Sequence, residues 1–153
     1  MFSQTIEYAL RAMMHLASLE PGASANSEVI AKATKVPQGY LSKVLRDLVV
    51  ADLIVSQRGP KGGFSLARGA DQISMLDVVN AVDSMQRIHR CPLGNPAHIK
   101  LCPLHQRIDS ALDHIEGEFR QTTLAEMLES GRAATGSCGA LVTPTVRKKK
   151  PRA

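Results

Sequence analysis

The sequence predicts a mainly α-helical protein: a winged helix-turn-helix domain with a small β-hairpin wing, followed by a long C-terminal dimerisation helix. Three patterns in the 153 residues support this fold class. Two amphipathic helices joined by a short turn come first, as in a helix-turn-helix. A pair of short strands around a glycine-rich turn follows. An apolar stripe then recurs at helical spacing over residues 104–119.

Caps and apolar spacing predict the first two helices. Ser3 can cap a helix that runs to about Leu19, just before a Pro-Gly pair. A second helix begins after Ser24 or Asn26 and ends near Thr34. The positions of this second helix predicted to face inward are Val29, Ile30 and Ala33.

The third helix is predicted to carry the binding face of the domain. Four apolar residues at i, i+3, i+4 and i+7 form its buried stripe: Leu41, Val44, Leu45 and Leu48. The first turn and the opposite face are small, polar and basic, and they provide the candidate DNA contacts Gln38, Gly39, Tyr40, Ser42, Lys43 and Arg46. A helix of this kind can lie in the major groove and reach base edges with its N-terminal residues.

Two short strands and a basic turn follow the third helix. Residues 53–56 and 64–66 are predicted to be strands, and residues 57–63 a glycine-rich turn. Arg58 and Lys61 in this turn could enter a minor groove or bind phosphates. The alternative is a buried helix followed by an ordinary surface hairpin. The combination of helix, hairpin and basic turn favours DNA binding.

A loop separates the helices of the second half of the chain. Ser74 and Asp77 form a capping box that begins a helix ending near Met85, and residues 87–101 contain the Pro and Gly of a loop. A last short helix is predicted from Thr122, after a threonine cap, to about residue 128.

The longest predicted helix begins at Pro103 and ends near Phe119. Its apolar stripe is Leu104, Ile108, Ala111, Leu112, Ile115 and Phe119. Such a stripe needs a partner surface, and a second copy of the chain is the simplest one. Packing on the first helix of the same chain is the alternative.

Charge and composition divide the chain and exclude several classes of protein. The net charge is +5, and its distribution suggests three parts. Residues 1–70, the predicted winged helix-turn-helix domain, carry +3, and residues 71–129, the predicted sensor loop and dimerisation helices, carry −4. Residues 130–153, a predicted disordered basic tail, carry +6. No apolar run approaches the ~20 residues of a membrane span, and the N-terminus lacks signal-peptide features. We therefore expect a cytoplasmic protein without membrane contact. The sequence contains no nucleophile motif, no phosphate-binding loop and no carboxylate pair, so we do not expect an enzyme.

Two cysteines and a histidine could carry chemistry. Cys102 and His105 form a Cys-x-x-His pair across a helix start, and Cys91 lies eleven residues before Cys102 in the predicted loop. Two thiolates and an imidazole suit zinc or an iron–sulfur cluster. The alternative is two free thiols and a surface histidine. Cys138 lies in the tail without an apparent partner.

Several motifs resemble those of the Rrf-two-type bacterial transcription regulators. They are residues 8–11 (YALR), Tyr40-Leu41 in the third helix and, most specifically, residues 56–67 (SQRGPKGGFSLA). The resemblance extends through residues 73–82 and the long helix to Leu128. It implies a DNA-binding transcriptional regulator, most often a repressor, that acts as a homodimer on a palindromic operator.

The cluster-binding branch of this family carries three cysteines before the long helix. Cys91 matches the first, Cys102 the last and His105 the histidine that follows, whereas Asn95 to His98 occupy the place of the middle cysteine. Glu7 matches an acidic ligand that some members supply from the partner subunit. The resemblance thus implies a two-iron–two-sulfur cluster held by these four residues, sensing redox, nitric-oxide or iron–sulfur status. The alternatives are a cluster-free member that responds to a metabolite, thiol oxidation or a partner protein, and a winged-helix protein-interaction module.

Overall fold

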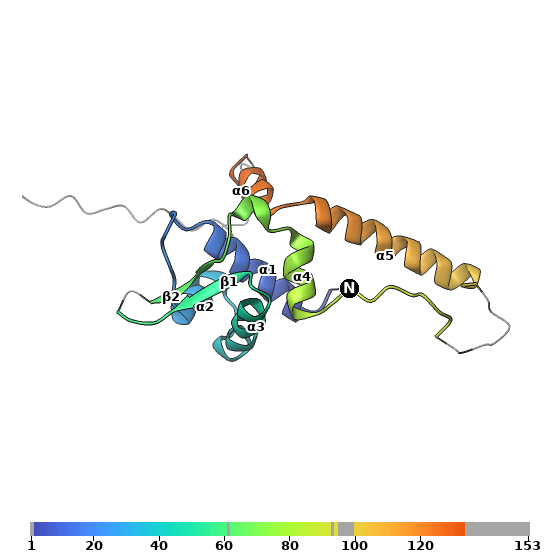
Figure 1. Cartoon of the computed structure of the whole chain (residues 1–153), viewed down its shortest axis with the longest axis horizontal. Helices are drawn as coiled ribbons and strands as arrows, with labels where there is room; N and C mark the ends of the chain where they lie inside the picture. The colour runs from blue at the N-terminus through green and yellow to red at the C-terminus, as the bar shows by residue number, and fades with distance from the viewer. Residues whose placement is uncertain (1, 61, 93, 95–99, 134–153) are drawn as a thin grey trace, which may run out of the picture.

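The computed structural model describes residues 2–60, 62–92, 94 and 100–133. This part of the chain is mainly helical, with one two-stranded antiparallel sheet (Figure 1). Its elements in order are α1 (Gln4–Ala17), α2 (Ser27–Thr34), α3 (Gln38–Val50), β1 (Ile54–Gln57), β2 (Gly63–Leu66), η1 (Ala70–Gln72), α4 (Met75–Val82), α5 (Pro103–Gln121) and α6 (Leu124–Ala133). The predicted fold class is confirmed.

The predicted caps begin three of the helices. The Ser3 hydroxyl accepts a hydrogen bond from the Ile6 N–H, and Asn26, of the two candidates, caps α2 through the Val29 N–H (2.9 Å). In α4 the Asp77 N–H donates to the Ser74 hydroxyl and the Ser74 N–H donates to the Asp77 carboxylate, at 3.1 and 3.0 Å. This capping box satisfies backbone donors that a helix start leaves unpaired.

Several predicted helix boundaries were wrong. α1 ends at Ala17 rather than Leu19, and α4 ends at Val82 rather than Met85, because Asp83 has an extended backbone (φ −162°). α6 begins after Thr123 rather than at Thr122, because Thr122 is the residue that closes α5. The Thr123 hydroxyl accepts a hydrogen bond from the Glu126 N–H. α6 also continues to residue 133, so the first residues of the predicted tail are helical. Residues 134–153, including Cys138, lie outside the described residues.

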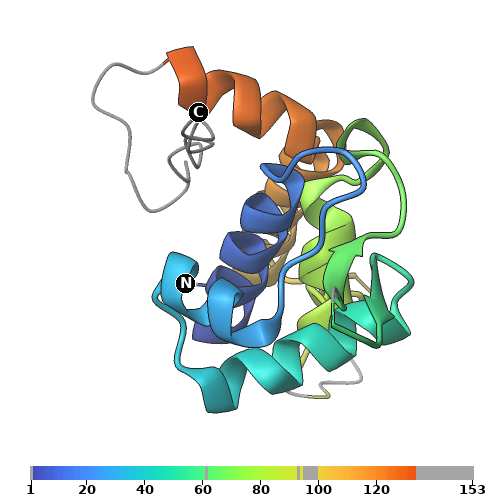
Figure 2. The ribbon, with the colours of Figure 1, turned by 90° about the vertical axis from the view of Figure 1, so that its left-hand side faces the viewer.

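One hydrophobic core surrounds α1, which contacts α2, α3, α4, α6 and β2. Figure 2 shows α3 crossing α1 on the side opposite α6. All four stripe residues of α3 are buried, at 0 to 2% exposure, and truncating such a leucine to alanine typically costs ~2–5 kcal/mol. The core also includes Ile73, Val78 and Leu124, so it continues past residue 70.

One inward position of α2 was predicted wrongly. Val29 is 50% exposed, whereas Ile30 and Thr34, four residues apart, are buried. The Thr34 hydroxyl donates to the Ile30 carbonyl at 2.7 Å. A helix of eight residues turns only one narrow face to the core, and Val29 lies about 100° around the helix from Ile30.

The β-hairpin is fixed to the segment between α1 and α2. Its register runs from Ile54 opposite Leu66 to Gln57 opposite Gly63. Ala25 adds one more bridge, because its N–H donates to the Phe64 carbonyl at 3.0 Å and its carbonyl accepts from the Phe64 N–H at 2.8 Å. A Cβ on Gly63 would lie 2.7 Å from the Ala25 backbone, so only glycine permits this close approach.

α5 extends away from the other helices (Figure 1). It contacts α4, and the ring of Phe119 stacks on Phe2 with centroids 5.3 Å apart. No α5 residue is buried, and its stripe residues Leu104 and Ile108 are 64% and 41% exposed. Much of the apolar stripe is therefore left uncovered by the described part of the chain. Within the described ranges, no helix is long and apolar enough to span a membrane.

Candidate DNA-binding surface and cysteine loop

The residues predicted to contact DNA from α3 all lie on its exposed side. Burial of the apolar stripe turns the remaining face outward: Gln38, Gly39, Tyr40, Ser42, Lys43 and Arg46 are all exposed. The Ser42 hydroxyl donates back to the Gln38 carbonyl at 3.0 Å. The Arg46 side chain, 75% exposed, has its nearest carboxylate, Asp47, 4.0 Å away.

An aromatic pair holds the first turn of α3 against α1. The rings of Tyr40 and Tyr8 are 6.0 Å apart at an angle of 59°, a tilted arrangement that aromatic pairs favour. Tyr40 is nevertheless 62% exposed. The sequence motif containing Tyr8 indicated the family and not this contact, which depends on how the two helices cross.

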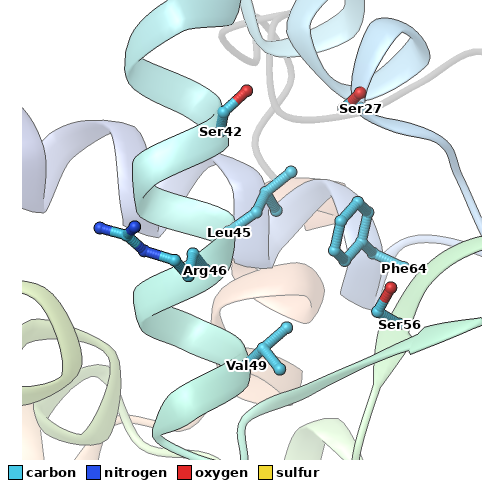
Figure 3. A pocket seen from close by; sticks show the side chains of 7 residues that line it. All are labelled: Ser27, Ser42, Leu45, Arg46, Val49, Ser56 and Phe64. Carbon is cyan, nitrogen blue, oxygen red and sulfur yellow. The ribbon is translucent and has the colours of Figure 1, made fainter.

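An open groove of about 340 Å³ separates α3 from the hairpin, lined by Ser27, Ser42, Leu45, Arg46, Val49, Ser56 and Phe64. In Figure 3, Leu45 and Val49 reach from α3 toward the side of the groove that carries Phe64, whereas the Arg46 guanidinium points away from it. The groove therefore has an apolar floor, and the Arg46 charge lies outside it, available to an external partner.

The turn of the hairpin carries the predicted basic residue Arg58. It is exposed and, like Lys43 on α3, makes no ion pair with any described residue. Unpaired cations on one surface favour an anionic partner. The predicted contact Lys61 lies outside the described residues.

Two of the three predicted loop ligands lie together. Cys102 occupies the position just before α5, and its Sγ is 3.2 Å from His105 Nδ1, one helical turn on. Cys91 and Cys102 are both free, half-buried thiols. Among the described residues, no three His, Cys, Asp or Glu side chains form a group able to hold a metal, so Cys91 does not join the pair.

Glu7, the candidate acidic ligand, is exposed on α1. Its carboxylate accepts from the Arg11 guanidinium, at 2.9 Å from Nε and 2.8 Å from the terminal nitrogen. Within one chain this is an ordinary ion pair between residues four apart on a helix. The region of Asn95 to His98, where the family places another cysteine, lies outside the described residues.

Sequence reasoning missed an arginine that fastens the loop to α5. Arg87 binds both oxygens of Asp109, at 2.7 and 2.8 Å, and also pairs with Asp113 and with Glu116 (3.6 Å). The Ile88 N–H donates to the same Asp109 carboxylate at 3.0 Å. These hydrogen bonds lower the pKa of Asp109 to about 2, and the Arg87 bond is the larger cause. The sequence did contain a signal for this contact: acidic residues recur at helical spacing along α5, and the loop before it is basic.

Comparisons with known proteins all point to the same family. The sequence model of the Rrf2 family, described as an iron-dependent transcriptional regulator, matches residues 2–130. A protein of Aquifex aeolicus provisionally named an HTH-type transcriptional regulator is 31% identical over 136 residues, which cover 83% of this chain and 90% of that protein. A provisionally named HTH-type regulator of Mycobacterium tuberculosis is 37% identical over 81 residues, 53% of this chain and 50% of that protein.

Solved structures share the fold. The cysteine regulator CymR of B. subtilis has a TM-score of 0.71 at 21% identity, covering 85% of this chain and 97% of that one. T. potens IscR has a TM-score of 0.72 at 23% identity, covering 85% and 87%. The family consists of transcriptional regulators, so the expectation that the protein is no enzyme is confirmed. The resemblance noted in the sequence is likewise confirmed: the chain belongs to the Rrf2 family of transcriptional regulators.

Proposed function

We propose that the protein is a transcriptional repressor of the bacterial cytoplasm that binds a palindromic operator as a homodimer. The observation that carries this proposal is the exposed polar face of α3 beside a hairpin whose Arg58 makes no ion pair with any residue that the structure describes. Gln38 and Ser42 have the hydrogen-bonding groups to read base edges, and Lys43 and Arg46 can bind guanine or phosphates. Arg58 and Lys61 of the hairpin would reach the adjacent minor groove or its phosphates.

The exposed stripe of α5 supports the homodimer. α5 has 19 residues and is therefore ~28 Å long, and none of its side chains is buried in one chain. An apolar helix face of this length requires a partner, and a copy related by a two-fold axis covers both faces at once. Two copies would carry two α3 helices, which suits two half-sites about one helical turn apart, or a multiple of it.

For sensing, we propose the loop between α4 and α5. The Cys102–His105 pair supports this assignment, since a thiol and an imidazole are metal ligands. Among the described residues of one chain only this pair comes together, and it does not complete the protein ligands of a two-iron–two-sulfur cluster. The proposed set is therefore shared between two copies: Cys91, Cys102 and His105 from one and Glu7 from the other.

A cluster-free sensor is the second candidate. Cys91 and Cys102 are free thiols, and the Glu7 carboxylate already has a cationic partner in Arg11. In this alternative the thiols themselves respond to oxidation, or the regulator responds to a metabolite or a partner protein.

DNA recognition is tested first. A duplex is selected from a random-sequence library with the wild-type protein, and its affinity is measured between 50 and 200 mM salt, a range over which phosphate contacts make binding fall steeply. Lys43→Ala and Arg58→Ala are each expected to weaken binding by ~1–3 kcal/mol without unfolding the protein, since both side chains are exposed.

Lys100→Ala is the matched control, because Lys100 is also exposed but lies just before α5, on the extended part of the molecule. Unchanged affinity in both test variants would refute the docking proposal. Failure of the wild type to select any duplex would favour a protein-interaction module.

A further inference from the structure

The turn between α2 and α3 contains a lysine in a backbone conformation that favours glycine. Lys35, just after α2, has φ 56° and ψ 33°, in the left-handed region. Its N–H and that of Val36 both donate to the Ala31 carbonyl, which closes the helix. Glycine usually occupies this place because a Cβ strains the left-handed conformation. The fold would thus accept glycine at this position. A specific role of the lysine is therefore to be sought in its side chain and not in its backbone.

The Lys35 side chain has no partner in the described part of the chain. It is exposed and makes no ion pair or side-chain hydrogen bond there. Lys32, three residues earlier, is also exposed in the last turn of α2. The carboxylate of α2, Glu28, lies in its first turn, about 10 Å along the axis from Lys35.

The position of the turn relates Lys35 to the proposed DNA contacts. α3 begins at Gln38, three residues after Lys35, with its exposed polar face. Two exposed cations, Lys32 and Lys35, thus lie at the end of α2, next in the chain to the start of the helix that carries Lys43 and Arg46. If the bases of a DNA strand contact the first helical turn of α3, the phosphates of that strand would pass the α2–α3 turn that contains Lys35. In other helix-turn-helix complexes the first helix of the motif likewise meets the DNA backbone.

We propose that Lys35 binds a phosphate of the DNA strand that α3 reads, so that the turn is a third contact beside α3 and the hairpin. This inference rests on the proposed function. A phosphate contact positions the protein and carries no sequence information. It also displaces a counterion, which gives it a measurable salt dependence.

A structural role for Lys35 makes a different prediction. A cation at the C-terminal end of α2 also interacts favourably with the helix dipole. If that were its purpose, removing the charge would lower the stability of the fold and leave DNA binding unchanged.

The experiment compares Lys35→Gly with Asp52→Gly. Asp52 is the other described non-glycine residue with positive φ (55°), and it is exposed in the turn after α3. Both variants relieve the same backbone strain, but only one removes a proposed contact. Thermal unfolding is measured together with affinity for the selected duplex and for a scrambled duplex over a range of salt.

We expect both variants to be at least as stable as the wild type. Lys35→Gly should lower the affinity for both duplexes by the same factor. It should also make the slope of log affinity against log salt concentration shallower by ~0.9 per subunit. Lys35→Arg should restore the slope, and Asp52→Gly should not reduce affinity.

Wild-type affinity and slope in Lys35→Gly would overturn the inference while the proposed function stands. Lower stability with unchanged binding would overturn it in favour of the dipole role, and a loss confined to the selected duplex would overturn the phosphate assignment. A wild-type protein that binds no duplex would instead refute the proposed function.

Discussion

At the scale of single residues, Gly39 stands where the fold does not require a glycine. It lies in the first turn of α3, its φ is ordinary for a helix, and a Cβ there would have no atom within 4 Å. Glycine lowers helix stability relative to alanine. Its presence on the exposed face is explained if another molecule approaches the backbone closely.

Gly39→Ala is therefore expected to stabilise the protein and to weaken DNA binding. The gain should be ~0.4–1 kcal/mol, because alanine restricts the unfolded chain, and the loss should appear in duplex titrations. Gly131→Ala in α6 is the matched control, since its Cβ is equally unobstructed. It should raise the unfolding temperature with no effect on binding. Unchanged affinity for DNA in Gly39→Ala would show that nothing approaches this backbone closely.

At the scale of elements, Arg87 joins the loop after α4 to α5. Its bidentate bond to Asp109, together with the Ile88 amide on the same carboxylate, fastens the start of the loop along the helix. Cys102 and His105 mark the other end of the loop, at the start of α5. The loop that carries the candidate sensor is thus attached to α5 near both of its ends.

Arg87→Ala should release the start of this loop without unfolding the core. The expected result is faster amide hydrogen exchange at Ile88, with little change in global stability, because these half-buried ion pairs fasten the loop to α5 and lie outside the hydrophobic core. Arg107→Ala, which removes an exposed arginine of the same helix, is the control. Equal exchange at Ile88 in both variants would show that Arg87 does not hold the loop.

The same contact defines a pH range. The pKa of Asp109 is lowered from 3.8 to about 2, chiefly by the Arg87 hydrogen bond. A lowered carboxyl pKa contributes stability that is present above the unfolded pKa and is lost as pH falls through the folded value. The Arg87–Asp109 bond should therefore be complete above about pH 4 and break only near pH 2.

At the scale of the whole molecule, the exposed stripe of α5 predicts the assembly state. Ile108→Asp should convert a dimer into a monomer at micromolar concentration, because a carboxylate would be buried in the apolar interface. Sedimentation velocity measures the change. Ser110→Asp adds the same charge at another exposed position of α5 and should remain dimeric. A wild-type protein that sediments as a monomer at high concentration would contradict the prediction.

The sensor proposal is also a property of the assembled molecule, since Glu7 would come from the second copy. Protein purified without oxygen should show visible absorbance from iron. The absorbance should disappear in Cys91→Ala and Cys102→Ala, and Cys138→Ala should retain it. Colourless protein without iron or acid-labile sulfide after anaerobic reconstitution would instead support the cluster-free alternative.

Local signals in the sequence were enough to predict the α-helices and the two strands of the described residues, although not the short 3-10 helix η1. The caps at Ser3, Asn26 and Ser74 and the buried stripe of α3 depend on neighbours within about one or two helical turns. The hairpin was predictable for the same reason, because its glycine-rich turn joins adjacent strands. The exposed face of α3 followed directly, since burial of one side of a helix turns the other side to solvent.

Tertiary structure alone decided which distant groups meet. The bond between Arg87 and Asp109 joins residues 22 apart, and the exposure of Val29 depends on where α2 lies on α1. Likewise, the sequence placed Cys91, Cys102 and His105 in one region, but only the pair within one helical turn came together. Spacing along a helix determines a distance, whereas the path of a loop is determined by the surfaces on which it packs, and a local sequence pattern does not contain that information.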